Sequence, residues 1–312
     1  MGATSVSPTD ERVEAATSVT ERQATVSAPS RRFSRPRLPG RPRIWFELLL
    51  IAVSYAVYSA IRNAAPDRVE DAQRHARWIW DLQGSMGLAF ERTVNHAVEG
   101  VTWLVVSMNY YYATLHFVVT IAVLVWLFRS HPGRYGPTRL VLFLTTGVAL
   151  LGYYFFPLAP PRLMEGMDFI DTARVHDTWG SLSAEDSAMA SVSNQYAAMP
   201  SMHIGWSVWC GITIAVLARP LWIKLLGALY PVLTLLVIVA TANHFWLDAV
   251  GGVICLGFGY LVAYLWFGRL CYRLPRAVDD PKEPVAATAV GMAAARAEAA
   301  APPGGDKDHA TP

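Results

Sequence analysis

The chain has 312 residues, of which 53% are hydrophobic and only 16% are charged, and its mean hydropathy is +0.29. Average soluble domains are about 25% charged, so this composition indicates an integral membrane protein. The formal net charge of +2 is too small to indicate binding to nucleic acid. The three cysteines lie within or beside apolar runs, without the spacing of a metal or redox site, and we interpret them as buried hydrophobic side chains.

Residues 1–43 are predicted to form a disordered basic arm on the cytoplasmic side. They are rich in Ser, Thr, Ala, Pro and Arg and show no apolar periodicity. The first 30 residues contain no apolar stretch typical of a signal peptide, so we expect no secretory signal there. Six arginines lie between positions 31 and 43, and we expect them to stay cytoplasmic and to contact anionic lipid.

Six apolar runs follow, each predicted to cross the membrane as a helix. A helix of ~18 residues is ~27 Å long, close to the thickness of the hydrocarbon core. The runs lie at 44–61, 110–128, 138–156, 202–218, 221–242 and 248–267. The expected fold is therefore an all-α, polytopic membrane domain with six transmembrane helices over residues 44–268. Residues 269–312, rich in Ala, Pro and Gly, are predicted to be a disordered cytoplasmic tail.

The segment 62–109, between the first two runs, carries apolar residues at helical spacing. This pattern predicts two amphipathic helices that lie on the membrane or cover one end of the helix bundle. The expected apolar faces are Val69, Ala72, Ala76, Ile79 and Trp80 in the first helix, and Phe90, Val94, Ala97, Val101, Leu104 and Met108 in the second.

The distribution of basic residues predicts the topology. With the N-terminus inside, the inner segments hold fourteen Arg or Lys residues and the two outer segments hold seven. The positive-inside rule therefore favours cytoplasmic N- and C-termini. An Ala- and Arg-rich composition without organelle signals indicates a bacterial plasma membrane. In this topology Arg162, His203 and His244 all reach the outer face.

Ionisable residues lie at the ends of these apolar runs. A charge near the bilayer core costs several kcal/mol, so such residues indicate a functional site. His244 and Asp248 are four residues apart, so they lie on one face of a helix, and the carboxylate can orient the imidazole. Such a histidine can act as a base or a nucleophile. His203 can protonate a leaving oxygen and Arg162 can clamp phosphate oxygens. The set predicts phosphoryl transfer through a phosphohistidine.

Two motifs, Pro200-Ser-Met-His203 and Asn243-His-Phe-Trp-Leu-Asp248, resemble those of the type 2 phosphatidic-acid phosphatase superfamily. Within it, the likeness is to the inositolphosphotransferase-like branch that includes inositol phosphorylceramide synthase. Three further pieces support this branch, namely Asn109-x2-Tyr112-x3-His116, Pro157-Leu-Ala-Pro-Pro-Arg162 and Phe169-Ile-Asp171. The resemblance covers roughly residues 45–268.

The resemblance implies roles for individual residues. His244 would be the nucleophile, Asp248 would orient it, and His203 would be the general acid. Arg162 would bind phosphate, together with Ser201 and the neighbouring N–H groups at the start of a helix. Further candidates for substrate binding are Pro200, Tyr112, His116 and Asn243. We expect no metal and no other cofactor, and the partner would be a lipid phosphate or phospholipid in the membrane.

Four positions depart from the superfamily's phosphatase pattern, and one of them is Met202, where the pattern has Gly. That pattern has a Lys seven residues before its first Arg, where this chain has Phe155, and Ser-Arg before the nucleophilic His, where Val237 and Ile238 stand. The phosphate pocket is therefore expected to hold fewer positive charges than in the better-known lipid phosphatases. The departures bear on the substrate and on the choice between hydrolysis and transfer.

Several residues have a structural interpretation as well. His116 can equally be a buried polar residue bonded to a carbonyl, and Asn243 can simply cap a helix. Tyr112, with its two neighbouring tyrosines, is also typical of an interfacial aromatic belt. Asp168 and Asp171 lie in a loop that we expect to be a solvated surface.

Three alternative functions stay open. The first is a non-catalytic lipid transporter or scaffold of the same fold, against which the intact histidine motifs argue. The second is a metal-dependent membrane hydrolase that uses the same histidines. The third is an inositol-phosphate head-group transferase that makes phosphosphingolipid- or glycolipid-like products.

Overall fold

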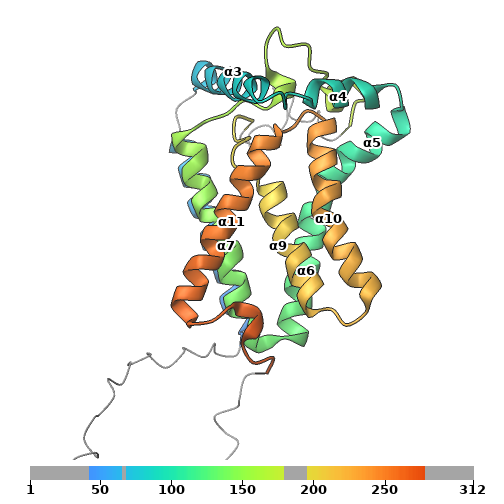
Figure 1. Cartoon of the computed structure of the whole chain (residues 1–312). Helices are drawn as coiled ribbons and strands as arrows, with labels where there is room; N and C mark the ends of the chain where they lie inside the picture. The colour runs from blue at the N-terminus through green and yellow to red at the C-terminus, as the bar shows by residue number, and fades with distance from the viewer. Residues whose placement is uncertain (1–41, 65–67, 179–194, 278–312) are drawn as a thin grey trace, which may run out of the picture. The chain divides into compact units, whose positions relative to one another are not determined.

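The computed structural model describes residues 42–64, 68–178 and 195–277 (Figure 1). Within these ranges the regular secondary structure is helical, and Leu158 and Ala197 form one isolated parallel β-bridge. Almost all of the expected basic arm and most of the expected tail lie outside the described residues, so both stay predictions. The all-α class expected from the sequence is confirmed.

Four helical segments are long and apolar enough to cross a membrane. They are residues 102–130, α7 (Pro132–Phe155), α10 (Leu221–Ala240) and α11 (Trp246–Phe267). The two other expected spans are also helical, as α2 (Ile44–Ala64) and α9 (Met202–Leu217), but their apolar parts are shorter. A multi-pass membrane protein is therefore supported, and the number of six crossings stays a prediction.

The second expected span begins eight residues earlier than predicted. Residues 102–130 form a continuous helical segment made of α5 (Thr102–Tyr110), the π-helical turn η1 (Tyr111–Leu115) and α6 (His116–Ser130). The sequence pattern predicts that the apolar run around Val105 belongs to an amphipathic outer helix. It belongs to the span, because the helical hydrogen bonding continues from it into α6 without interruption.

Two separate helices occupy the outer segment before this span. In α3 (Val69–Ser85) the residues Ala72, Ala76 and Ile79 are buried as expected, whereas Val69 is exposed. In α4 (Glu91–Glu99) the expected apolar face is confirmed only at Val94, which is half-buried against the core. Phe90 and Ala97 are exposed, and the fully buried residues are Glu91 and Asn95. Backbone groups of the loops beneath α4 need hydrogen-bond partners, and these polar side chains supply them.

The central helix of the bundle is α9, which contacts α6, α7, α10 and α11 (Figure 1). Small residues allow these helices to approach closely, as is common in membranes. A Cβ added at Gly252 of α11 would lie 2.3 Å from the carbonyl oxygen of Ser201, and one at Gly211 of α9 would lie 2.6 Å from that of Gly227. The start of α9 is therefore pressed directly against α11.

Two sets of short segments close the ends of the bundle. At one end, α3, α4 and the loop with η2 (Pro161–Leu163) and α8 (Thr172–Val175) cover the positions where α10 ends and α11 begins. At the other end, η4 (Cys271–Arg273) packs on α7 and α9. The first residues of the expected tail are thus folded against the bundle, and the Arg276 carbonyl accepts a hydrogen bond from the Gly133 N–H.

Candidate functional site

Three predicted site residues from two sequence motifs form one row of hydrogen bonds. His244 lies in the loop between α10 and α11, and its Nδ1 is 3.2 Å from Asp248 Oδ2. Its Nε2 is 3.4 Å from Nδ1 of His203, in the first turn of α9. His244 and Asp248 are buried, so the row is largely withdrawn from solvent.

The local sequence explains how Asp248 is held. Asp248 is the third residue of α11, and its Oδ2 also accepts the Phe245 N–H at 3.0 Å, which closes the first turn of the helix. The carboxylate therefore has a fixed place before it meets His244. Its other oxygen, Oδ1, is buried without a hydrogen-bond partner among the described residues.

Tyr112 and His116 extend the row on the side of His203. The Tyr112 ring stacks on the His203 ring with centroids 4.2 Å apart, and the His116 ring lies at the same distance. His116 Nδ1 is 3.1 Å from the Tyr112 carbonyl oxygen. His116 is therefore bonded to a carbonyl, as its structural interpretation predicts, and its ring also borders the site. Tyr112 packs inside the bundle, not in an aromatic belt. Both residues belong to the π-turn or its end, a feature common at functional sites.

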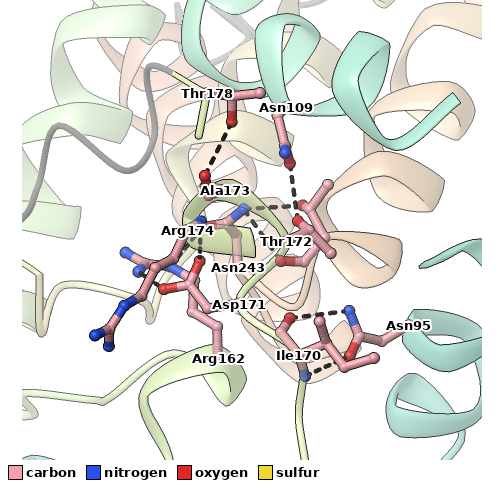
Figure 2. Close-up of polar contacts among 11 residues, drawn as sticks. Asn95, Asn109, Arg162, Ile170, Asp171, Thr172, Ala173, Arg174, Thr178 and Asn243 are labelled. Carbon is pink, nitrogen blue, oxygen red and sulfur yellow. Dashed lines mark hydrogen bonds and ion pairs between the residues drawn. The ribbon is translucent and has the colours of Figure 1, made fainter. Parts of the chain in front are cut away.

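Arg162 is tied to the loop that carries His244 (Figure 2). Its Nε donates to Asn243 Oδ1 at 2.9 Å, and its backbone N–H donates to the Ala242 carbonyl at 2.9 Å. Asn243 in turn donates to Thr241 Oγ1, so the loop is braced internally. Asn243 thus does more than cap a helix, because it links the arginine to the residue beside His244.

Asp171 forms an ion pair with Arg162, which corrects the expectation that it lies on a solvated surface. Its Oδ2 accepts from Nη1 of Arg162 at 3.1 Å, and its Oδ1 accepts the Arg174 N–H at the start of α8 (Figure 2). Asp168, three residues earlier, has a side chain that is 81% exposed, as expected. Asp171 reduces the net positive charge that Arg162 can offer to a ligand.

Ser201 lies directly before α9 and is fully buried, and its Oγ has no hydrogen-bond partner among the described residues. Its N–H donates to the Asp248 carbonyl at 2.8 Å, so this backbone group is already used. The following N–H groups, at Met202 and His203, occupy positions that a helix leaves without an intrahelical partner. The hydroxyl and these amides are therefore the phosphate-binding candidates at this helix end.

Pro200 holds the start of α9 in place. A Cβ added at Gly152 of α7 would meet its ring at 2.6 Å, and one at Gly251 of α11 would meet it at 3.1 Å. Its carbonyl accepts from the Tyr153 hydroxyl at 2.9 Å. These contacts suit positioning of Ser201 and His203, and the predicted contact of Pro200 with substrate stays a prediction.

Two of the positions that depart from the phosphatase pattern, Phe155 and Ile238, take no part in the row of hydrogen bonds. Phe155, where the pattern has Lys, is 71% exposed at the end of α7. Ile238 is fully buried, and its carbonyl accepts the N–H groups of Asn243 and His244.

Sequence reasoning missed two polar residues of α4 that support the site. Glu91 accepts a hydrogen bond from the Trp246 N–H, and Asn95 donates one to the Ala240 carbonyl. Their spacing of four residues was visible in the sequence, but the same spacing is typical of a solvated helix face. Across the described ranges, no group of three or more His, Cys, Asp or Glu side chains has an arrangement that could hold a metal ion.

The arrangement can therefore orient one imidazole, offer it a second imidazole as proton donor, and hold an anion near an arginine and a helix N-terminus. Residues 77–262 match the family model described as the PAP2 superfamily. No curated protein and no solved structure matches the chain.

Proposed function

Because the chain belongs to the PAP2 superfamily, whose members are typically phosphatases, we propose that it transfers a phosphoryl group from a membrane lipid through a phosphohistidine on His244. The observation that carries the proposal is the row from Asp248 through His244 to His203. It places Asp248 on Nδ1 of His244 and His203 on Nε2 of His244.

In the first step His244 acts as the nucleophile. Asp248 accepts the Nδ1 proton of His244, so the lone pair is on Nε2, the nitrogen that faces His203. A phosphate ester that replaces the contact between the two rings would form a bond from phosphorus to Nε2 of His244 while its bond to the lipid oxygen breaks. His203 would donate its proton to that departing oxygen.

In the second step water or an alcohol displaces His244 from phosphorus. The new oxygen–phosphorus bond forms as the nitrogen–phosphorus bond breaks, and the proton of the incoming oxygen passes to His203. Both histidines then return to their starting states. This chemistry is complete with the side chains of the chain itself, so we expect no requirement for a metal or another cofactor.

Phosphate binding is assigned to the groups around the row. Arg162 would supply the charged, forked donor. Ser201 would supply a hydroxyl that has no partner in the described part of the chain, with the first N–H groups of α9 beside it. Asn243 would orient Arg162, while Tyr112 and His116 would line the side of His203.

The site is proposed to face the outer leaflet of a bacterial plasma membrane, with both termini cytoplasmic. It lies where α9 and α11 begin and α10 ends, away from the arginines that precede α7 or follow α11. We infer six crossings, with α2 and α9 included. With 16 residues α9 is ~24 Å long, and its place among four other helices reduces its need to match the lipid thickness.

The ion pair between Arg162 and Asp171 favours a second candidate, the transfer of a substituted phosphoryl head group. A phosphomonoester carries up to two negative charges and a phosphodiester carries one. An arginine that already neutralises a carboxylate is better matched to the single charge. This agrees with the inositolphosphotransferase-like branch, in which the donor would be a phospholipid and the product a phosphosphingolipid- or glycolipid-like molecule.

A labelling experiment tests the proposal directly. Purified protein in detergent, with a chelator present, would be given lipid phosphates and phospholipids labelled at phosphorus, and then acid-labile, base-stable protein label would be measured. We expect label in the wild type and in His96→Ala, a variant of a histidine on the outer surface of α4, and none in His244→Ala.

The same samples separate the alternatives. Release of inorganic phosphate identifies a phosphatase, and transfer of label to an added alcohol without release identifies a head-group transferase. Equal turnover in His244→Ala would disprove the phosphohistidine. Activity that is seen only in a parallel sample without the chelator would favour the metal-dependent hydrolase. Lipid movement across vesicles without any turnover would favour the transporter.

A further inference from the structure

Two polar residues on α4 are completely buried although α4 is an outer helix. Glu91 and Asn95 lie one helical turn apart, so both side chains point to the same side of α4. Burial of a carboxyl or an amide group costs free energy unless it is hydrogen-bonded. Their partners therefore indicate what this face of α4 is for.

The partners lie at the two ends of the loop that carries His244. Glu91 Oε1 accepts the N–H of Trp246, the first residue of α11, at 3.1 Å. Asn95 Nδ2 donates at 2.9 Å to the carbonyl of Ala240, the last residue of α10. The two side chains thus hold both ends of residues 241–245, the loop that contains His244 and its neighbour Asn243.

Asn95 also holds the loop that orients Arg162. Its Oδ1 accepts the Ile170 N–H at 2.8 Å, and its Nδ2 donates to the Ile170 carbonyl at 3.2 Å (Figure 2). Ile170 directly precedes Asp171, the ion-pair partner of Arg162. One buried amide therefore connects the loop of the proposed nucleophile with the loop of the proposed phosphate clamp.

Glu91 is supported from the neighbouring outer helix. The side-chain amide of Gln83, near the end of α3, donates to the same carboxylate oxygen that accepts the Trp246 N–H. Gln83 is also fully buried. The contact to α11 is thus held from two helices.

We propose that Glu91 and Asn95 are positioning residues, which hold the two ends of the 241–245 loop and thereby set the place of His244 opposite His203. The inference rests on the proposed function, because it assumes that Nε2 of His244 must be in line with the phosphorus. A displacement of about 1 Å in such a reaction can cost about 100-fold in rate. The bundle core is formed by other residues, so the effect should be local.

The test compares Glu91→Ala and Asn95→Ala with two matched variants. Glu91→Gln keeps an oxygen acceptor for Trp246, and Thr93→Ala alters an exposed residue of the same helix. We expect kcat and the rate of phosphoenzyme formation to fall about 10- to 100-fold in both alanine variants at positions 91 and 95, with KM changed less than about threefold. Glu91→Gln and Thr93→Ala should resemble the wild type.

Backbone hydrogen exchange provides a second measurement that does not depend on turnover. We expect the amides of residues 241–246 to exchange faster in Glu91→Ala and Asn95→Ala, while protection in the middle of α9 and α11 is retained. Unchanged exchange and kcat in both variants would overturn the positioning role. Faster exchange throughout the bundle would overturn it too, because the residues would then support the whole fold.

Failure of the proposed function would give a different set of results in these measurements. A wild type that forms no phosphoenzyme would remove His244 as a nucleophile, while the exchange measurement would still show whether Glu91 and Asn95 hold the loop. An active wild type with unaffected alanine variants would leave the phosphohistidine in place and remove only the positioning role.

Discussion

Arg139 and Arg162 lie near opposite ends of α7, and each is paired with a carboxylate in a mostly buried position. Arg139 pairs with Glu47 of α2, and the Tyr135 hydroxyl donates to the same carboxylate at 2.8 Å. The rings of Phe46, Tyr135 and Phe143 surround its guanidinium at 5.4 to 6.0 Å. This pair joins two helices inside an aromatic enclosure.

Arg162 shares the chemistry of Arg139 but not its surroundings. Its carboxylate partner, Asp171, comes from a loop, and its other hydrogen bond goes to Asn243 beside His244. A phosphate ester could replace one of these partners without separating two helices. The comparison teaches that the role of a buried arginine depends on which elements its partners belong to, and that only the pair beside the histidine row is placed for ligand binding.

The largest expected effect is the loss of activity in Arg162→Ala. Removal of a preorganised donor from a developing phosphoryl charge typically costs about 100- to 1000-fold in rate. We therefore expect kcat/KM for the preferred lipid substrate to fall by that factor, measured as product formation in detergent. The control is Arg139→Ala, which should retain most of its activity per folded molecule. Equal losses in both variants would remove the distinction between the two pairs.

The next effect concerns stability at the other end of α7. Arg139→Leu leaves Glu47 as a mostly buried carboxylate without its cation, and breaking such a pair costs about 3 kcal/mol. We expect a clearly lower midpoint of thermal unfolding in detergent. The double variant with Glu47→Leu should recover much of this loss, because no unpaired charge remains. A single variant as stable as the wild type would show that the pair does not join α2 to α7.

A smaller effect is expected on substrate preference in Asp171→Asn. The substitution keeps the shape of the side chain and removes its charge, so Arg162 would offer more positive charge to a ligand. The ratio of kcat/KM for a phosphomonoester to that for a phosphodiester should rise about twofold to fivefold, since the removal of one charge from the pair is expected to change binding by up to about 1 kcal/mol. Asp168→Asn is the control, because Asp168 is exposed. An unchanged ratio would contradict the charge-matching argument.

The smallest effect is a pH dependence of stability at the Glu91 end. Burial raises the pKa of the Glu91 carboxyl above its usual value of 4.5. The folded state therefore binds this proton more tightly than the unfolded state does. Its contribution to stability is fully present below about pH 4.5 and is lost as the pH rises through the higher pKa of the folded state.

Thermal unfolding of the wild type and Glu91→Gln between pH 4 and pH 8 measures this contribution. The stability of the wild type relative to the variant should decrease as the pH rises, by about 1 kcal/mol for each unit by which the pKa is raised. Parallel curves for the two proteins would show that Glu91 binds its proton equally well in both states.

Much of the fold could be predicted because the membrane imposes a simple local rule. A long apolar run must form a helix to satisfy its backbone, and the runs behind α7, α10 and α11 are visible without any tertiary information. Boundaries were less certain, as the early start of the helix at Thr102 shows. Over about two turns from Thr102, the apolar residues fit both a transmembrane helix and an amphipathic helix.

The sequence by itself determined the candidate residues of the site. His244 and Asp248 are hydrogen-bonded, as their spacing predicts, although His244 lies in the loop before α11 and not on the helix with Asp248. The approach of His203 and Arg162 follows from the order of the apolar runs. These predictions needed only helix geometry and topology.

Only the tertiary structure decided which other residues support these candidates. Glu91 meets Trp246 across 155 positions of sequence, and Asn95 meets Ala240 across 145. Asp171 was likewise expected on a solvated surface, and the structure shows that it pairs with Arg162. A single polar side chain has the same local pattern whether it faces water or a buried backbone group. Its role depends on the partner that folding brings to it, and a local pattern does not contain that partner.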